Sequence, residues 1–282
     1  MRTCWLQAQP SSGCDPGAVA IACAASDRSR ERMPNPNELN TALGWGAISS
    51  GGLVIGALAG SFGGLSHRTI ALTMSVGAGI LLAAASIELT VEAVRTGGSL
   101  STAISLLVGA TLFSVVNAML TAFGAANRKR CGDCAPQPSE SQQPGSGMAI
   151  ALGTALDAVP EALVLGLALH EASFPLELVM AIAVGNLPEA LSGSAGMRSA
   201  GRSHRYVLVL WTAIAIGTAV LTAVGYGAVD LLNQSWPPRL QAFGAGALVA
   251  MTAETMIPEA FHDSPRYSGL LAAIGFSALL LI

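Results

Sequence analysis

Charged side chains are scarce in this chain of 282 residues. Only 11% of its residues are charged, against about 25% in soluble globular domains, and 52% are hydrophobic. Apolar runs of about 20 residues, the length that crosses a bilayer as a helix, recur along the sequence. This composition excludes one compact soluble domain. It predicts an all-α fold, a polytopic integral membrane bundle of about eight transmembrane helices.

The sequence also lacks a basic stripe with interleaved aromatic residues, and its net charge is −3. Nucleic acid is therefore not an expected partner. The cysteines avoid the apolar runs: Cys4, Cys14 and Cys23 precede the first run, and Cys131 and Cys134 lie in one loop. A disulfide framework is not expected from this distribution.

The apolar runs divide the chain into a polar leader, three spans, a flexible loop and five further spans. These four parts are 1–40, 41–124, 125–146 and 147–282. In the leader, Pro34 and Pro36 are expected to break any helix before the first span, and Met33 is an alternative translation start. The predicted spans are 42–64, 69–91, 100–124, 147–169, 176–197, 207–231, 240–262 and the short 267–282.

Small residues fill the first three spans. Glycine allows helix backbones to approach closely in lipid, so we expect these three spans to pack against one another, with no chemistry attached to the glycines. The glycines concerned are Gly51, Gly52, Gly56, Gly60, Gly63, Gly64, Gly77 and Gly79.

Positive residues favour the loops that follow odd-numbered spans. The loops after even-numbered spans hold only Arg95 and Arg239. Because cytoplasmic loops carry the excess of lysine and arginine, the bias predicts an extracytoplasmic N-terminus and a cytoplasmic loop 125–146, in the plasma (inner) membrane. The residues in the first set of loops are Arg68, Arg128, Lys129, Arg130, Arg198, Arg202, Arg205 and Arg266.

Carboxylates occur inside the spans, where an ionised one costs about 2.5–3.5 kcal/mol and needs a compensating ligand, water or proton. Glu92 and Glu259 lie near span ends, where a carboxylate can reach the interface. Asp157, Glu161 and Glu189 lie deep within apolar runs, and Asp157 and Glu161 are four residues apart on one helical face. No arginine or lysine within a span is an obvious partner for any of them. The full set is Glu88, Glu92, Asp157, Glu161, Glu189, Glu254 and Glu259.

A Pro-Glu pair recurs in three spans, at Pro160-Glu161, Pro188-Glu189 and Pro258-Glu259. Proline lacks an N–H and clashes with the carbonyl four residues earlier, so each pair is expected to kink its helix and free one carbonyl. A freed carbonyl one turn from a carboxylate is an oxygen pair suited to a cation. The carbonyls concerned belong to Leu156, Val184 and Glu254.

These motifs resemble the ZIP (Zrt/Irt-like) family of divalent-metal transporters, whose fourth and fifth spans each carry a segment ending in Pro-Glu-Gly and together form a mid-membrane metal site. The matching stretches here are 157–162 and 185–190, with support from 85–89 and 254–260. The similarity runs from the first span to the last. It implies eight spans, an extracytoplasmic N-terminus and a cytoplasmic loop after the third span.

The chain departs from the family at the customary histidines. Asp157-Ala158 stands where the family usually has His-Asn, and Gly185 stands where it has His or Gln. The sixth span has no acidic residue between Trp211 and Tyr226, and the 125–146 loop has no histidine. The resemblance carries over Asp157, Glu161, Asn186 and Glu189, an all-oxygen set. Oxygen ligands suit harder ions, so the expected substrate shifts from zinc toward manganese or iron, with no organic cofactor.

The remaining carboxylates are candidates for lining the pathway or carrying protons: Glu88, Glu92, Glu254 and Glu259. Metal binding to carboxyl groups releases protons, so transport is expected to depend on pH. Cys131 and Cys134 are spaced like half of a zinc site and are candidate regulatory ligands. The alternative for this pair is two reduced cysteines with no role.

Other functions fit less well. A ZIP-like protein that no longer transports, and serves as a sensor or assembly subunit, is the main alternative. An enzyme is not expected: an intramembrane aspartyl protease needs two aspartates where only Asp157 qualifies, and no His-Glu-x-x-His motif occurs. An organic-cation permease would need aromatic residues beside the carboxylates, and none flanks Asp157 or Glu189. The expected partners are metal ions and the lipid bilayer, with a homodimer as a candidate assembly.

Overall fold

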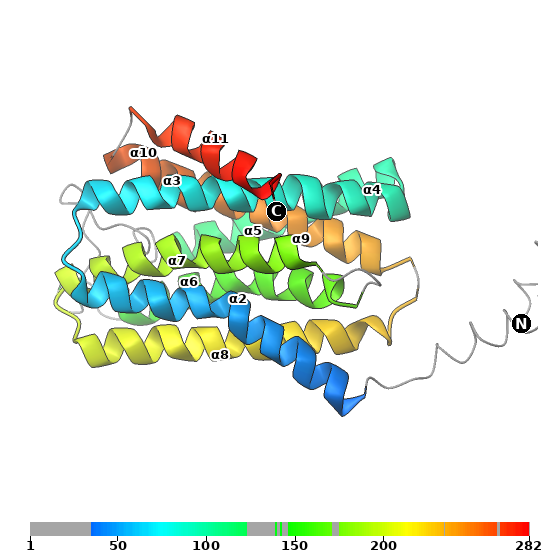
Figure 1. Cartoon of the computed structure of the whole chain (residues 1–282), viewed down its shortest axis with the longest axis horizontal. Coiled ribbons are helices and arrows are strands. Elements are labelled where there is room, and N and C mark those ends of the chain that lie inside the picture. The colour runs from blue at the N-terminus through cyan, green and yellow to red at the C-terminus, as the bar shows by residue number, and fades with distance from the viewer. Residues whose placement is uncertain are drawn as a thin grey trace, which may run out of the picture.

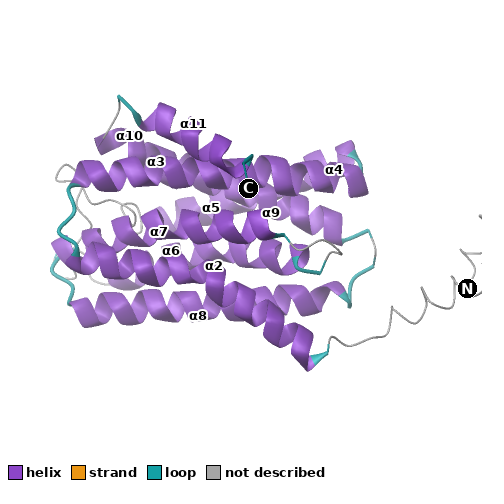
Figure 2. Cartoon of the chain, viewed as in Figure 1, coloured by secondary structure: helices purple, strands orange, loops and turns teal. Residues whose placement is uncertain are grey.

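A computed structural model describes residues 35–122, 139, 142, 146–170, 175–233, 235–263 and 266–281. This part of the chain forms helices and no strand, which confirms the all-α prediction (Figure 2). The helices are α2 (Pro36–Phe62), α3 (His67–Ala83), η1 (Ala84–Thr90), α4 (Val91–Gly97), α5 (Ser99–Leu120), α6 (Ser146–Ala168), α7 (Leu176–Ser199), α8 (His204–Val229), α9 (Pro237–Met251), η3 (Thr252–Met256), α10 (Ile257–Asp263) and α11 (Ser268–Leu279).

Seven of the helical segments in the described part are long and apolar enough to cross a membrane. Two of them are composite, because α3, η1 and α4 run on as one span and α9, η3 and α10 as another. The protein is therefore an integral membrane bundle. The eighth apolar helix, α11, has only 12 residues, which at about 1.5 Å per residue is shorter than the hydrocarbon core.

The first span begins earlier than predicted. Asn35 caps α2 by accepting a hydrogen bond from the Asn37 N–H at 3.2 Å, and Glu38 completes the capping box by accepting from the Asn35 N–H at 3.0 Å. Pro36 was expected to break a helix, yet it opens this one, because the first helical position needs no N–H donor. The end of the predicted leader, from Pro36 on, is therefore helical.

Two spans in the described part of the chain contain an internal π-helical turn, η1 or η3, that the sequence pattern did not reveal. In η1 the hydroxyl of Thr90 donates to the carbonyl of Ala85, five residues earlier, at 2.7 Å. The other turn, η3, ends two residues before Pro258, whose missing N–H favours a widened turn. Each π turn carries one of the carboxylates that the sequence analysis proposed for the pathway, Glu88 or Glu254, and π turns are frequent at functional positions.

The bundle divides into two groups of helices. The first helix group consists of α2, α6, α7 and α8, in which α2 packs against α7 and α8, and α6 packs against α8. The second helix group consists of α3–η1–α4, α5, α9–η3–α10 and α11, in which α5 packs against α9, and α11 and α10 pack against α3. The groups meet where α3 contacts α7 and where α6 contacts α9. Figure 1 shows α3, α4 and α11 along one side of the bundle and α2 and α8 along the other.

The sequence suggested that the glycines of the first span pack against the second and third spans, but they do not. Gly52, Gly56 and Gly60 face α7, where an added methyl group would overlap a carbonyl oxygen of that helix in each case. Helices adjacent in sequence need not be adjacent in space, and α2 packs chiefly against α7 and α8. The glycine stripe therefore positions α7, which carries two of the predicted site residues.

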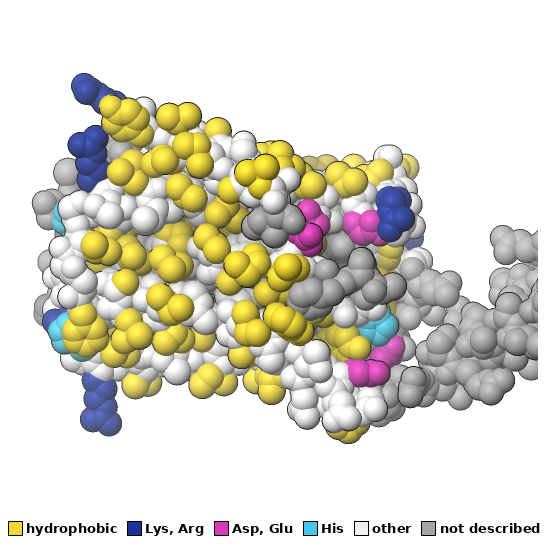
Figure 3. Space-filling view, viewed as in Figure 1, with side chains coloured by type: hydrophobic (Ala, Val, Ile, Leu, Met, Phe, Trp, Pro, Cys, Tyr) yellow, Lys and Arg dark blue, Asp and Glu magenta, His cyan; other side chains and the backbone are white. Residues whose placement is uncertain are grey.

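The two ends of the bundle differ in charge. Figure 3 shows arginine side chains gathered at one end and most of the visible carboxylates toward the other, with a belt of hydrophobic side chains between them. The arginine end holds Arg68, Arg198, Arg202, Arg205 and Arg266. The acidic end holds Glu38, Glu92, Glu177 and Asp230, together with Arg95 and Arg239. Which end faces the cytoplasm stays a prediction.

Candidate functional site

The four residues carried over for the metal site all lie in the interior of the first helix group. Asp157 and Glu161 of α6 are both 0% exposed, and Asn186 and Glu189 of α7 are 1% and 2% exposed. The two helices contact each other. The sequence therefore identified two buried pairs of oxygen-bearing side chains on neighbouring helices.

The amide of Asn186 is oriented by α2. Its Nδ2 donates to the backbone carbonyl of Ser49 at 3.1 Å, where Gly52 brings the two helices into close contact. Its Oδ1 is buried and accepts no hydrogen bond from any residue that the structure describes. A buried acceptor left unsatisfied costs about 1–3 kcal/mol. The oxygen is thus available to a ligand that offers positive charge or a proton.

Each of the two site helices contains an internal proline beside its glutamate. Pro160 lies within α6 and Pro188 within α7, and both helices continue past the proline. Because proline has no N–H, the carbonyls of Leu156 and Val184 lose their usual donor. These backbone oxygens belong to the same turns as Asp157 and Asn186, which adds acceptors to an already oxygen-rich region.

The carboxylates do not form a complete metal cage by themselves. No three His, Cys, Asp or Glu side chains within the described ranges lie close enough to share one ion. A cation between α6 and α7 would therefore need the Asn186 amide, backbone carbonyls or water as further ligands. Cys131 and Cys134 lie outside the described residues, so their regulatory role stays a hypothesis.

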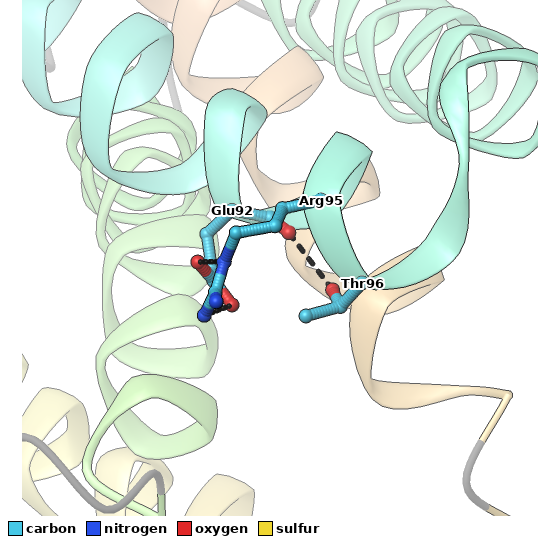
Figure 4. A network of polar contacts seen from close by, with 3 residues as sticks. All are labelled: Glu92, Arg95 and Thr96. Carbon is cyan, nitrogen blue, oxygen red and sulfur yellow. Dashed lines mark hydrogen bonds and ion pairs between the residues drawn. The ribbon is translucent and has the colours of Figure 1, made fainter.

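Glu92 has a charged partner, contrary to the sequence interpretation. Its carboxylate binds Arg95 through two contacts, Nε to Oε2 at 2.7 Å and Nη2 to Oε1 at 2.8 Å (Figure 4). The hydroxyl of Thr96 donates to the Glu92 carbonyl at 2.8 Å. Arg95 was assigned to a loop, but α4 extends to Gly97 and places it one turn from Glu92. This pair lies at the acidic end and resembles an ordinary surface ion pair.

Glu88 is half-buried in η1 and lies within electrostatic range of Glu177, in the first turn of α7. The two carboxylates belong to different helix groups. Sequence analysis did not single out Glu177, although it lies in the first turn of the predicted span 176–197. The available signal was Pro175, which precedes the helix and places Glu177, two residues later, in the first turn of α7.

Glu254 lies on an exposed face of the bundle, outside the buried site. Its carboxylate accepts hydrogen bonds from the hydroxyl of Ser114 and from Nδ2 of Asn117, the latter at 2.8 Å. Both donors belong to α5 and were not identified from the sequence. Their spacing of three residues places them on one face of the helix, which was the available signal for such a pair.

Glu259 is buried within the bundle. It is 7% exposed, and its Oε1 accepts a hydrogen bond from the hydroxyl of Ser192 at 2.7 Å. The helix α10 packs against α3 and η3, and its Glu259 contacts Ser192 of α7. Whether Glu259 lies at the depth of the membrane interface stays a prediction. Ser192 was overlooked, although it follows Glu189 by one helical turn.

No protein-family model matches the chain, and no curated protein is similar enough to count as a relative. The resemblance to the ZIP family therefore rests on the motifs and on the spans that carry them.

Proposed function

We propose that this protein transports a divalent metal cation across the membrane through the buried region lined by Asp157, Glu161, Asn186 and Glu189. The observation that carries the proposal is the buried Oδ1 of Asn186, which accepts no hydrogen bond from the described residues and lies one turn from Glu189. A cation held by the Asn186 amide, at most two of these carboxylates at a time, backbone carbonyls and water satisfies that oxygen. It also offsets the cost of burying carboxylates.

The donor set suits a hard ion. Carboxylate, amide and carbonyl oxygens favour manganese or ferrous iron. Sites that select zinc are instead rich in histidine and thiolate ligands. Zinc remains a candidate because the motifs resemble those of zinc-transporting ZIP proteins. The order of preference among zinc, manganese, iron and cobalt is therefore the measurement that separates these ions.

The charge distribution suggests a direction. The acidic end concentrates cations near its mouth, where Glu88 and Glu177 come from different helix groups. The arginine end faces the cytoplasm if the positive-inside rule holds. We infer uptake from the acidic end toward the arginine end, with alternating access arising from movement of the two helix groups against each other. A reporter fused into loop 125–146 tests the orientation, which is wrong if the reporter is found outside the cell.

The decisive experiment is uptake of the four metals into proteoliposomes. The native protein is compared with the double variant Glu161→Gln, Glu189→Gln, which keeps side-chain size but removes two charges. Glu38→Gln is the matched control, because glutamine at this position preserves the capping box of α2. We expect the double variant to abolish uptake and the control to retain it. Uptake that survives in the double variant would place the pathway elsewhere.

A second function is favoured by the incomplete cage, since the described residues hold no group of three His, Cys, Asp or Glu ligands. In this alternative the chain is a ZIP-like membrane protein that acts as a metal sensor or assembly subunit without transport. Metal binding to the purified protein without uptake of any ion supports the alternative. Uptake that requires Glu161 and Glu189 rejects it.

A further inference from the structure

The buried hydrogen bond between Ser192 and Glu259 joins the two helix groups. Ser192 belongs to α7 of the first group and is 0% exposed, and Glu259 belongs to α10 of the second. Ser192 lies one turn beyond Glu189, on the side of the arginine end, because α7 runs from the acidic end toward Ser199. The bond therefore lies between the candidate metal site and the arginine end.

Apolar and glycine contacts between the helix groups lie close to this bond. One turn away, Pro188 of α7 packs against Gly77 of α3, where an added methyl group would lie 2.6 Å from the proline ring. Such contacts are non-directional, whereas a hydrogen bond to a carboxylate has a preferred geometry and is stronger in a low-dielectric interior. The Ser192–Glu259 bond thus specifies one relative position of α7 and α10.

We propose that Glu259 is a positioning residue of the transport cycle, whose bond to Ser192 closes the pathway between the metal site and the arginine end. The inference rests on the proposed function. When the first helix group moves, the bond breaks and the pathway opens toward the arginine end. The released carboxylate of Glu259 is then the first oxygen that a departing cation meets after Glu189. Glu259 therefore acts through α7 in the closed state and on the cation in the open state.

The chain contains a matched control for the serine. Ser194 is also 0% exposed and lies on the same helix, but its hydroxyl donates to the Leu191 carbonyl of its own helix at 3.1 Å. Ser192→Ala removes a bond between groups, and Ser194→Ala removes a bond within one helix. Glu259→Gln adds a third case, because glutamine still accepts the serine hydrogen bond but carries no charge.

Hydrogen–deuterium exchange of the purified protein tests closure without depending on transport. In Ser192→Ala we expect amides of residues 190–199 to exchange about tenfold faster, the shift expected from loss of a hydrogen bond to a charged group. Ser194→Ala and Glu259→Gln should exchange like the native protein. Equal exchange in the two serine variants overturns the inference, even if the native protein transports metal.

Uptake measurements test the role of the charge. Both Ser192→Ala and Glu259→Gln should lower the turnover of uptake about tenfold while changing KM less than about twofold, since the metal site is intact. Glu259→Asp should restore part of the turnover.

A parallel loss of metal affinity and thermal stability in Glu259→Gln would show a merely structural role and overturn the proposal. If the native protein takes up no metal, the proposed function is rejected, and so is this role of the Glu259 charge. The exchange experiment still tests whether the Ser192–Glu259 bond holds the two helix groups closed.

Discussion

The contacts within the two helix groups differ in kind from the contacts between them. Within the groups, glycine brings backbone against backbone. Gly56 of α2 meets the Leu187 carbonyl of α7, and Gly79 of α3 meets the Ala272 carbonyl of α11. Between the groups, glycine meets side chains instead, as where Gly185 of α7 packs against Leu81 of α3.

This difference indicates which parts of the bundle can rearrange. A backbone carbonyl cannot move without moving its helix, so the contacts within a group hold the helices at one distance and register. A side chain can change rotamer, so the contacts between groups tolerate displacement. Asp157, Glu161, Asn186 and Glu189 all lie in the first group, which means that the candidate site moves as one unit with its helices.

Gly56→Ala should produce the largest effect on stability. The added methyl group overlaps the Leu187 carbonyl oxygen, and α2 and α7 must separate to relieve the overlap. We expect a loss of about 3 kcal/mol, the upper end of overpacking costs, measured by thermal unfolding in detergent. The control is Gly51→Ala, which meets nothing within 4 Å and should be neutral or stabilising by up to about 1 kcal/mol.

Gly185→Ala should cost less, because its methyl group meets a side chain. The nearest atom is Cγ of Leu81 at 2.7 Å, and that leucine can shift in part. We expect a loss of about 1–2 kcal/mol in the same unfolding assay. A loss as large as that of Gly56→Ala would remove the distinction between the two kinds of contact.

Asn117→Ala tests a polar contact within the second group. It removes one of the two donors to Glu254 and leaves Ser114 in place. We expect a destabilisation of about 1 kcal/mol, with KM and turnover of uptake unchanged. A change in metal uptake with native stability would instead return Glu254 to the transport pathway.

Arg95→Ala should have the smallest effect. The Arg95 side chain is 74% exposed, and exposed ion pairs contribute about 0–1 kcal/mol. The unfolding temperature should therefore stay close to that of the native protein, and so should uptake. Reduced metal uptake in this variant at low salt, restored at high salt, would show that the Glu92 pair shapes the mouth at the acidic end.

Much of the fold follows from local sequence. Apolar runs of bilayer length predict spanning helices because lipid offers no partner for backbone N–H and C=O groups, and seven such helices are present in the described part of the chain. The four carried-over residues were also predicted to share a region, and all four are buried on contacting helices. Hydropathy predicts the spans because it acts over a few helical turns, whereas this set of four residues came from the resemblance to the ZIP motifs.

Other features depend on contacts between distant residues, and no local pattern contains them. The glycines of α2 could pack on any neighbour, and only the assembled bundle selects α7. The place of Glu259 near the end of a span does not reveal its partner, and the packing of α10 brings it against Ser192, 67 residues away. Local sequence determines which segments enter the membrane, whereas tertiary packing decides which polar side chains meet there, because side chains such as Asn186 and Glu259 take their hydrogen-bond partners from other helices.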